Sequence, residues 1–295
     1  MPPSPHRPPE LTGRAFRGSA VVRAGLLTPA QLRSSAWRQL YPDVYACTTL
    51  DVDHAARAQA VARLLLPDAV VIGRSAAVLW GVVLAGAAEP VSCSVSPSCR
   101  ADALDRVVLT RRRLTAGEVT RRGSTQVTTP LRTALDLCRG RPLDDAVVDL
   151  DRFLAHGLVD LASVRSAARG LTGRDCRHVR SVAALADGLA GSPQETRLRL
   201  LLARAGLPAP VAQFIVRDGA RFVARVDFAW PEHRLALEYD GAWHGGTAQF
   251  RADRARLNAV ASAGWRTVFA TAVDLRRPAG LLDLLRRHMA ARTSA

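Results

Sequence analysis

Two apolar segments separated by a short turn constrain the fold more than any other feature of this chain. Residues 221–230 and 234–240 are rich in aliphatic and aromatic residues, and Pro231-Glu232-His233 lies between them. This pattern predicts an antiparallel β-hairpin with its turn centred on Glu232 and His233.

Three acidic residues fall on one face of this predicted hairpin. The register places Asp227 opposite Glu238, with Cβ atoms about 4.5–5.5 Å apart, and Asp240 lies two residues further along the same face. Unpaired acids this close repel one another unless a cation is bound, and oxygen ligands alone favour Mg²⁺ or Mn²⁺. We therefore predict that Asp227, Glu238 and Asp240 ligate such a metal. The alternative is an ordinary ion pair of Asp227 with Arg225 or Arg234.

Two further residues are candidates for catalysis. Glu195 lies three residues after Ser192, so it either closes a capping box at a helix start or contributes a ligand. His244 lies in the glycine-rich segment 241–246, directly after the acidic strand. A histidine at this place could transfer a proton to or from water or a leaving group.

Arginines lie on the helix expected over 247–263. Arg251 and Arg254 are three residues apart and share one face, and Arg256 follows, so the three could hold phosphate groups of a nucleic acid. Because Asp253 stands among them, an exposed helix with internal salt bridges is the alternative.

The charge of the whole chain also favours a polyanionic partner. All 41 basic residues among the 295 are arginine, the formal net charge is +15, and lysine is absent. Excess positive charge favours nucleic acid, with a basic but inert surface as the alternative. Any mechanism that needs a catalytic lysine is excluded.

Several classes of protein do not fit the sequence. The five cysteines form no CxxC pair, which argues against a zinc cluster or a disulfide scaffold. The longest uncharged apolar run, 76–88, is too short to span a bilayer. The proline-rich start has no apolar stretch typical of a secretory signal. We expect a cytoplasmic protein without a membrane partner.

The chain divides into four predicted parts. Residues 1–10 are expected to form a disordered tail. Residues 11–50 contain short helices, one starting at Thr28, and a hairpin, which predicts a winged-helix-like DNA-binding unit or a generic helical cap. Residues 51–190 are expected to form an α+β middle domain. Small residues at 188–192 indicate a boundary, and 191–295 form an α/β domain.

The C-terminal third resembles the restriction-endonuclease-like PD-(D/E)xK superfamily, in the branch related to very-short-patch mismatch repair (Vsr) endonucleases. The matching residues are Glu195 on a helix, Arg225-Val226-Asp227-Phe228, Glu238-Tyr239-Asp240-Gly241, Trp243-His244, Asp253-Arg254-Ala255-Arg256-Leu257-Asn258 and Gly264-Trp265.

The resemblance implies a mixed sheet flanked by helices and metal-dependent cleavage of DNA. Asp227 and Glu238 would be the metal ligands, with Glu195 and His244 at the positions of the family's helix acid and histidine. The superfamily's lysine would fall at Asp240, which leaves the activation of water unassigned.

Residues 12–140 are more weakly similar to AbiEi-type bacterial antitoxins. The matching segments are 27–32, 37–45, 74–81 and 133–137. This family carries an N-terminal winged helix that binds DNA, and the resemblance implies a toxin or another protein as a further partner.

Two hypotheses follow from these observations. The first is a DNA-binding protein whose C-terminal domain is a divalent-metal-dependent endonuclease. The second is a non-enzymatic, antitoxin-like transcriptional regulator with a degenerate nuclease fold. Cleavage of RNA instead of DNA is a third reading, because such a nuclease need not show an RNA-reading motif.

Overall fold

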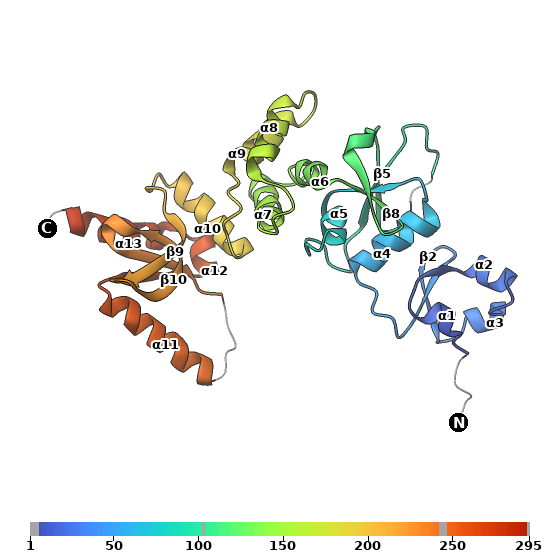
Figure 1. The fold of residues 1–295 in the computed structure, drawn as a ribbon, viewed down its shortest axis with the longest axis horizontal. Helices are drawn as coiled ribbons and strands as arrows, with labels where there is room; N and C mark the ends of the chain where they lie inside the picture. The colour runs from blue at the N-terminus through green and yellow to red at the C-terminus, as the bar shows by residue number, and fades with distance from the viewer. Residues whose placement is uncertain (1–5, 102–103, 242–246, 294–295) are drawn as a thin grey trace. The chain divides into compact units, whose positions relative to one another are not determined.

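The computed structural model describes residues 6–101, 104–241 and 247–293, and it describes side chains over 6–101, 104–241 and 253–290. The chain forms two compact units, Met1–Arg139 and Gly140–Ala295 (Figure 1). Both are mixed assemblies of helices and sheets, which confirms the coarse fold class expected from the sequence. Over the described residues, no helix is both long and apolar enough to span a membrane.

The first unit begins with three short helices beside a small antiparallel sheet. Its strands pair in the order β1-β3-β2. The elements are α1 (Pro9–Thr12), β1 (Phe16–Arg17), α2 (Gly18–Arg23), α3 (Pro29–Leu32), β2 (Trp37–Tyr41) and β3 (Val44–Cys47). The turn between β2 and β3 places Asp43 at φ +58. Its carboxylate accepts hydrogen bonds from the backbone N–H and the hydroxyl of Ser19, which hold the turn against α2.

The helix predicted from Thr28 is shorter than its pattern indicated. Thr28 and Gln31 do form the expected capping box, but α3 ends at Leu32 after about one turn. Trp37 packs inward from β2, against Phe16 of β1 with ring centroids 5.3 Å apart.

The rest of the first unit is built on a five-stranded mixed sheet in the order β6-β5-β4-β8-β7. Its strands are β4 (Val70–Val71), β5 (Val91–Val95), β6 (Val107–Arg111), β7 (Val119–Arg122) and β8 (Thr125–Thr128). The other elements are α4 (His54–Ala60), which continues as the π-helix η1 (Val61–Leu65), α5 (Gly73–Leu79), η2 (Ala116–Glu118) and α6 (Pro130–Leu137). Aliphatic side chains of α4, α5 and these strands form one core.

The second unit starts with helices α7 (Leu143–Leu154), α8 (Leu161–Gly170), α9 (Cys176–Leu185) and α10 (Pro193–Arg204). Polar contacts join α10 to α7: the Thr196 hydroxyl and the Arg199 guanidinium both donate to Asp151, at 3.0 and 2.7 Å. The two compact units divide at Arg139, and the boundary predicted at 188–192 stays a prediction. Asp151 also accepts the N–H of Gly188, so that segment is held against α7.

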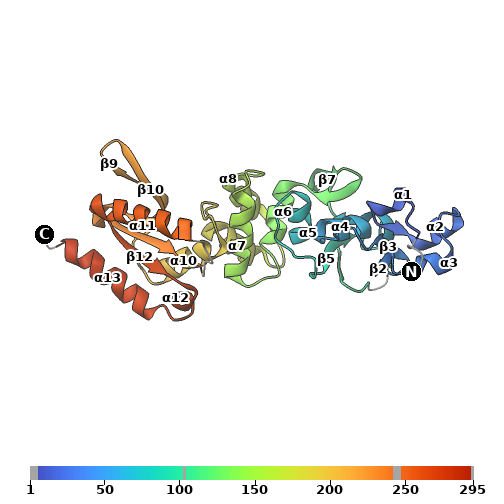
Figure 2. The same ribbon diagram turned by 90° about the horizontal axis from the view of Figure 1, so that it is seen from below.

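A four-stranded mixed sheet completes the second unit, in the order β12-β11-β10-β9. The elements are β9 (Val211–Asp218), β10 (Arg221–Trp230), η3 (Pro231–His233), β11 (Leu235–Tyr239), α11 (Thr247–Ser262), β12 (Arg266–Ala270), α12 (Ala272–Arg276) and α13 (Ala279–Thr293). Figures 1 and 2 show α11 and α13 on opposite sides of this sheet. Leucines of α10 and α13 pack on one face, and smaller side chains with Trp265 pack on the other.

Candidate functional site

The acidic residues gather where β10 and β11 separate. The paired positions run from Trp230↔Leu235 to Phe228↔Leu237, which confirms the hairpin register predicted from the sequence. One position further, Oδ2 of Asp227 accepts the backbone N–H of Tyr239 at 2.8 Å. The carboxylate thus accepts an N–H of β11 that a backbone carbonyl of β10 would otherwise accept. This contact fixes the Asp227 side chain where the pairing of β10 and β11 ends.

Glu238 is held by a guanidinium from α11. The two Nη atoms of Arg256 each donate to one oxygen of Glu238, both at 2.8 Å. Glu238 is 9% exposed, so this bidentate pair is largely shielded from water and is stronger than a surface ion pair. Arg256 was predicted to contact nucleic acid; in the structure both of its terminal nitrogens bind this carboxylate.

Glu195 reaches the same region from the first turn of α10. Its Oε2 accepts the N–H of Gly191 at 2.7 Å and the side-chain amide of Gln213 at 2.9 Å. Ser192 caps the helix by accepting the N–H of Glu195 at 3.2 Å. The cap is therefore made by Ser192, while the Glu195 carboxylate binds groups outside the helix.

Glycine at position 191 allows this close approach. A Cβ atom there would lie 3.3 Å from Oε1 of Glu195 and 3.4 Å from Oε2, tighter than an ordinary van der Waals contact. A larger residue would push the carboxylate away from its partners.

The electrostatics of Asp227 show that these acids influence one another. Burial, together with the negative charges of Glu195 and Glu238, raises the pKa of the Asp227 carboxyl to about 6. The Tyr239 N–H and the Arg256 guanidinium act in the opposite direction. The cluster carries an excess of negative charge when all three acids are ionised, because the guanidinium of Arg256 is paired with Glu238.

The donor set was compared with the needs of a divalent cation. Carboxylate oxygens suit Mg²⁺ and Mn²⁺, and the negative charge around Asp227 would be relieved by a cation. Over the described part of the chain, however, no three His, Cys, Asp or Glu residues lie close enough together to hold a metal ion. The residues fit in chemistry and charge, while the Glu238 oxygens are bound to Arg256, so a metal would compete with that guanidinium.

The remaining predicted residues are placed as follows. Asp240 is exposed, and its backbone N–H donates to the carbonyl of Ala270 at 2.7 Å, so its side chain lies outside the buried cluster. Arg254 is exposed on α11. His244 and the side chain of Arg251 lie outside the described residues.

The alternative pairing of Asp227 is not seen. Neither Arg225 nor Arg234 forms an ion pair with Asp227 among the residues that the structure describes. Sequence reasoning did not identify Gln213, which binds Glu195. Its backbone has φ +51, and no pattern in the sequence marks an amide at this position as part of an acidic cluster.

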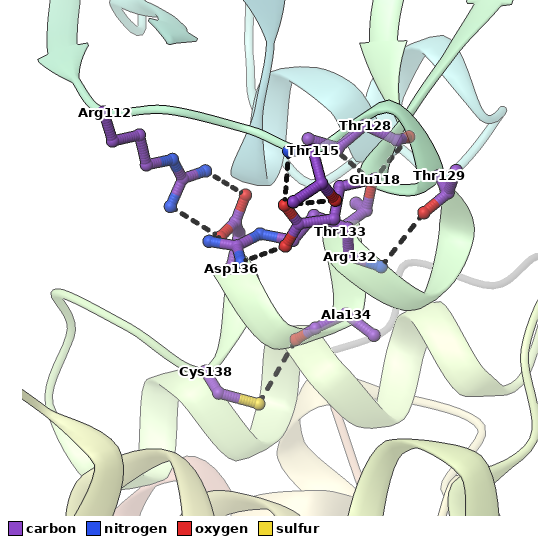
Figure 3. A network of polar contacts seen from close by, with 10 residues as sticks. All are labelled: Arg112, Thr115, Glu118, Thr128, Thr129, Arg132, Thr133, Ala134, Asp136 and Cys138. Atoms are coloured by element: carbon purple, nitrogen blue, oxygen red, sulfur yellow. Dashed lines mark hydrogen bonds and ion pairs between the residues drawn. The ribbon is translucent and has the colours of Figure 1, made fainter. Parts of the chain in front are cut away.

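A second buried charged cluster lies in the first unit (Figure 3). Arg112 binds both oxygens of Asp136 at 3.0 and 2.5 Å. Arg132 donates to Asp136 at 2.9 Å and to Glu118 at 2.7 Å. Two acids face two guanidiniums here, so charge is balanced, and the cluster ties α6 to the segment between β6 and β7.

The chain was compared with known proteins. It is 33% identical over 165 residues to two uncharacterised proteins of Mycobacterium tuberculosis, one from strain CDC 1551 / Oshkosh and one from strain H37Rv. The match covers 55% of this chain and 61% of each relative, so the chain spans less than two thirds of their length. No family model matches the chain. No solved structure matches it significantly. The chain is therefore similar to mycobacterial proteins that are themselves uncharacterised.

Proposed function

We propose that this chain is a DNA-binding protein with a divalent-metal-dependent endonuclease site at Glu195, Asp227 and Glu238. One observation carries the proposal: burial and the negative charges of Glu195 from α10 and Glu238 from β11 raise the pKa of Asp227, which lies at the opening of a mixed sheet. Such an arrangement costs stability when the acids are ionised, and binding a cation would recover it.

The residues would divide the work. A bound Mg²⁺ or Mn²⁺ would polarise the scissile phosphate and lower the pKa of the attacking water. Asp227, fixed by the Tyr239 N–H, would hold the ion together with Glu238, from which the ion would displace Arg256. Glu195 keeps the start of α10 against Gln213 and adds negative charge beside Asp227.

A group other than lysine would have to accept the proton of the attacking water. Lysine is absent from the chain, so the proton of the attacking water has to reach another group. His244 is the proposed acid or base because it follows the acidic strand in the sequence. Arg254, exposed on α11, is the proposed phosphate contact.

The same proposal includes the fold family of each part of the chain and the place where it binds DNA. The β12-β11-β10-β9 sheet with helices on both sides would be a restriction-endonuclease-like domain. The helices and small sheet at 9–47 would be a winged-helix-like DNA-binding unit. The net charge of +15 would supply salt-dependent, largely sequence-independent affinity for DNA in the cytoplasm.

Plasmid nicking tests the enzyme. Supercoiled plasmid is incubated with the protein and Mg²⁺ or Mn²⁺, beside Asp227→Ala and the exposed-acid control Asp218→Asn. We expect nicking by the parent and the control and a loss of at least about 100-fold in Asp227→Ala. Equal nicking by Asp227→Ala would show that a contaminating nuclease acts. A structured RNA in parallel separates DNA from RNA cleavage.

A second function is favoured by a different observation. Arg256 engages both oxygens of Glu238, as expected if a structural ion pair has replaced a metal site. The protein would then be a non-enzymatic, antitoxin-like regulator that binds DNA and a toxin or another protein. DNA binding in a gel-shift assay, without nicking under any divalent ion, would support this function and exclude the enzyme.

A further inference from the structure

A basic pocket lies at the opposite end of β11 from the carboxylates. It has a volume of about 360 Å³ and is lined by side chains of η3 and the residue after it, the end of α11, the start of β12 and α13. Its lining residues are His233, Arg234, Leu235, Ala261, Gly264, Trp265, Arg266 and His288. Four of these are arginine or histidine and none is acidic, so the pocket has a positive electrostatic character.

The sheet register brings the two arginines together. Leu235 of β11 pairs with Arg266 of β12, and the N–H of Arg266 donates to the carbonyl of Arg234 at 2.9 Å. The two guanidiniums thus start from adjacent backbone positions. Within the described part of the chain, neither forms an ion pair with a carboxylate.

Glycine at position 264 leaves room for one of these guanidiniums. A Cβ atom there would lie 2.8 Å from Nη1 of Arg234, a distance that real side chains do not tolerate. Gly264 also has φ +77. Arg234 therefore lies close to the turn after α11, and both line the pocket.

Histidine and tryptophan complete the lining. Arg266 donates to Nδ1 of His288 at 2.6 Å, so Nε2 of the neutral ring carries the hydrogen and can donate to a ligand. Burial lowers the pKa of His288, and the charges of Arg266 and Arg287 lower it further. Trp265 packs on Phe214 with centroids 5.2 Å apart, which fixes the indole at the pocket wall.

One carboxylate lies near this pocket. Glu232 is 3.9 Å from Nε2 of His233, and its side chain is 61% exposed. An exposed acid at this distance is screened by water and neutralises little of the positive charge. The pocket therefore presents two guanidiniums and an imidazole N–H, which are donors suited to a phosphate group.

We propose that this pocket binds a phosphate group, at a site separate from the carboxylate cluster. The guanidiniums of Arg234 and Arg266 hold the phosphate oxygens, and His288 donates a further hydrogen bond. The phosphate comes either from a free mononucleotide, whose size suits the pocket, or from the backbone of a nucleic acid. The site adds a recognition function that cleavage at Asp227 does not require.

Isothermal titration calorimetry on the full chain tests the proposal. Inorganic phosphate, a deoxynucleoside monophosphate and a short DNA duplex are titrated separately into the parent, Arg266→Gln, Arg234→Gln and the exposed control Arg221→Gln. We expect both pocket variants to weaken phosphate binding by about tenfold or more, and the control by less than about twofold. Asp227→Asn should bind phosphate like the parent, because its site is distinct.

The three probes separate the sources of phosphate. Tighter binding of the mononucleotide than of inorganic phosphate, lost in Arg266→Gln, identifies a nucleotide pocket. A pocket-dependent signal with the duplex alone identifies a backbone contact. Equal affinities for parent and pocket variants, or no binding of any probe, would overturn the proposal. Circular dichroism of each variant shows whether the fold is kept, and Arg266→Glu, with a reversed charge, provides a second variant.

Discussion

The two charged clusters of this protein differ in their balance of negative and positive charge. In the first unit, Asp136 and Glu118 face Arg112 and Arg132. In the second unit, Arg256 binds Glu238, while the charges of Glu195 and Glu238 act on Asp227. A buried carboxylate that faces its own guanidinium is stabilised, whereas one that faces other carboxylates is destabilised. The first cluster therefore stabilises the fold, whereas ionisation of Asp227 in the second cluster is unfavourable.

The pKa directions follow this difference. Burial opposes ionisation of Glu118, yet the Thr115 N–H and the Arg132 guanidinium hold its pKa below the ordinary value. Burial and neighbouring acids raise the pKa of Asp227 to about 6. The environment thus favours the ionised acid in one cluster and the protonated acid in the other.

The largest expected effect is in the balanced cluster. Asp136→Asn leaves the guanidiniums of Arg112 and Arg132 without their shared carboxylate, and we expect a loss of about 3–5 kcal/mol in the free energy of unfolding. Urea unfolding of the full chain measures this, with the exposed Asp51→Asn as control, for which we expect a change within about 0.5 kcal/mol. A small effect of Asp136→Asn would show that the cluster contributes little to stability.

The unbalanced cluster should respond in the opposite direction. Asp227→Asn removes a strained charge but keeps an oxygen for the Tyr239 N–H, so we expect stability at pH 7.5 to rise by up to about 3 kcal/mol. The folded pKa of about 6 lies above the ordinary value of 3.8 for an aspartate, so the parent loses stability as pH rises between these values. The variant should lack this loss, and parent and variant should converge near pH 4. A less stable variant at pH 7.5 would contradict the assignment.

Removing the arginine of the second cluster should have a smaller effect on stability. Arg256→Gln removes the bidentate partner of Glu238, and we expect a loss of about 1–2 kcal/mol, reduced because the Arg256 side chain is 35% exposed. Millimolar Mg²⁺ should restore part of the loss, since the ion can take the place of the guanidinium. The exposed Arg225→Gln should show neither effect. Absence of any Mg²⁺ effect on the Arg256 variant would argue for a purely structural ion pair.

The smallest expected effect concerns the helix caps beside the clusters. Thr129 caps α6 and Ser192 caps α10 through their side chains. Replacing either by alanine should cost about 1 kcal/mol, measured by thermal unfolding. Because the Glu195 carboxylate binds Gly191 and Gln213 independently of the cap, Ser192→Ala should leave nicking unchanged. A lost activity in Ser192→Ala would show that the cap also positions Glu195.

Much of the second unit's fold was predictable from local patterns. The hairpin register, the helix ending near Gly206 and the strand after Gly264 follow from alternation and capping residues. Contacts between distant residues are not visible in local patterns. Trp37 of β2 packs against Phe16 of β1, and Asp151 of α7 accepts the N–H groups of Asp187 and Gly188.

In the candidate site, too, some features follow from local sequence and others from tertiary packing. The alternation of side chains along two strands is a local property, so the sequence by itself determined that Asp227 and Glu238 lie near each other. Only the tertiary structure decided that Glu195 and Gln213 join them and that Arg256, eighteen residues beyond Glu238, binds both oxygens of that acid. Such contacts depend on how a helix packs on the sheet, and the sequence spacing does not specify that packing. The basic pocket likewise exists because parallel pairing of β11 and β12 aligns residues far apart in the chain.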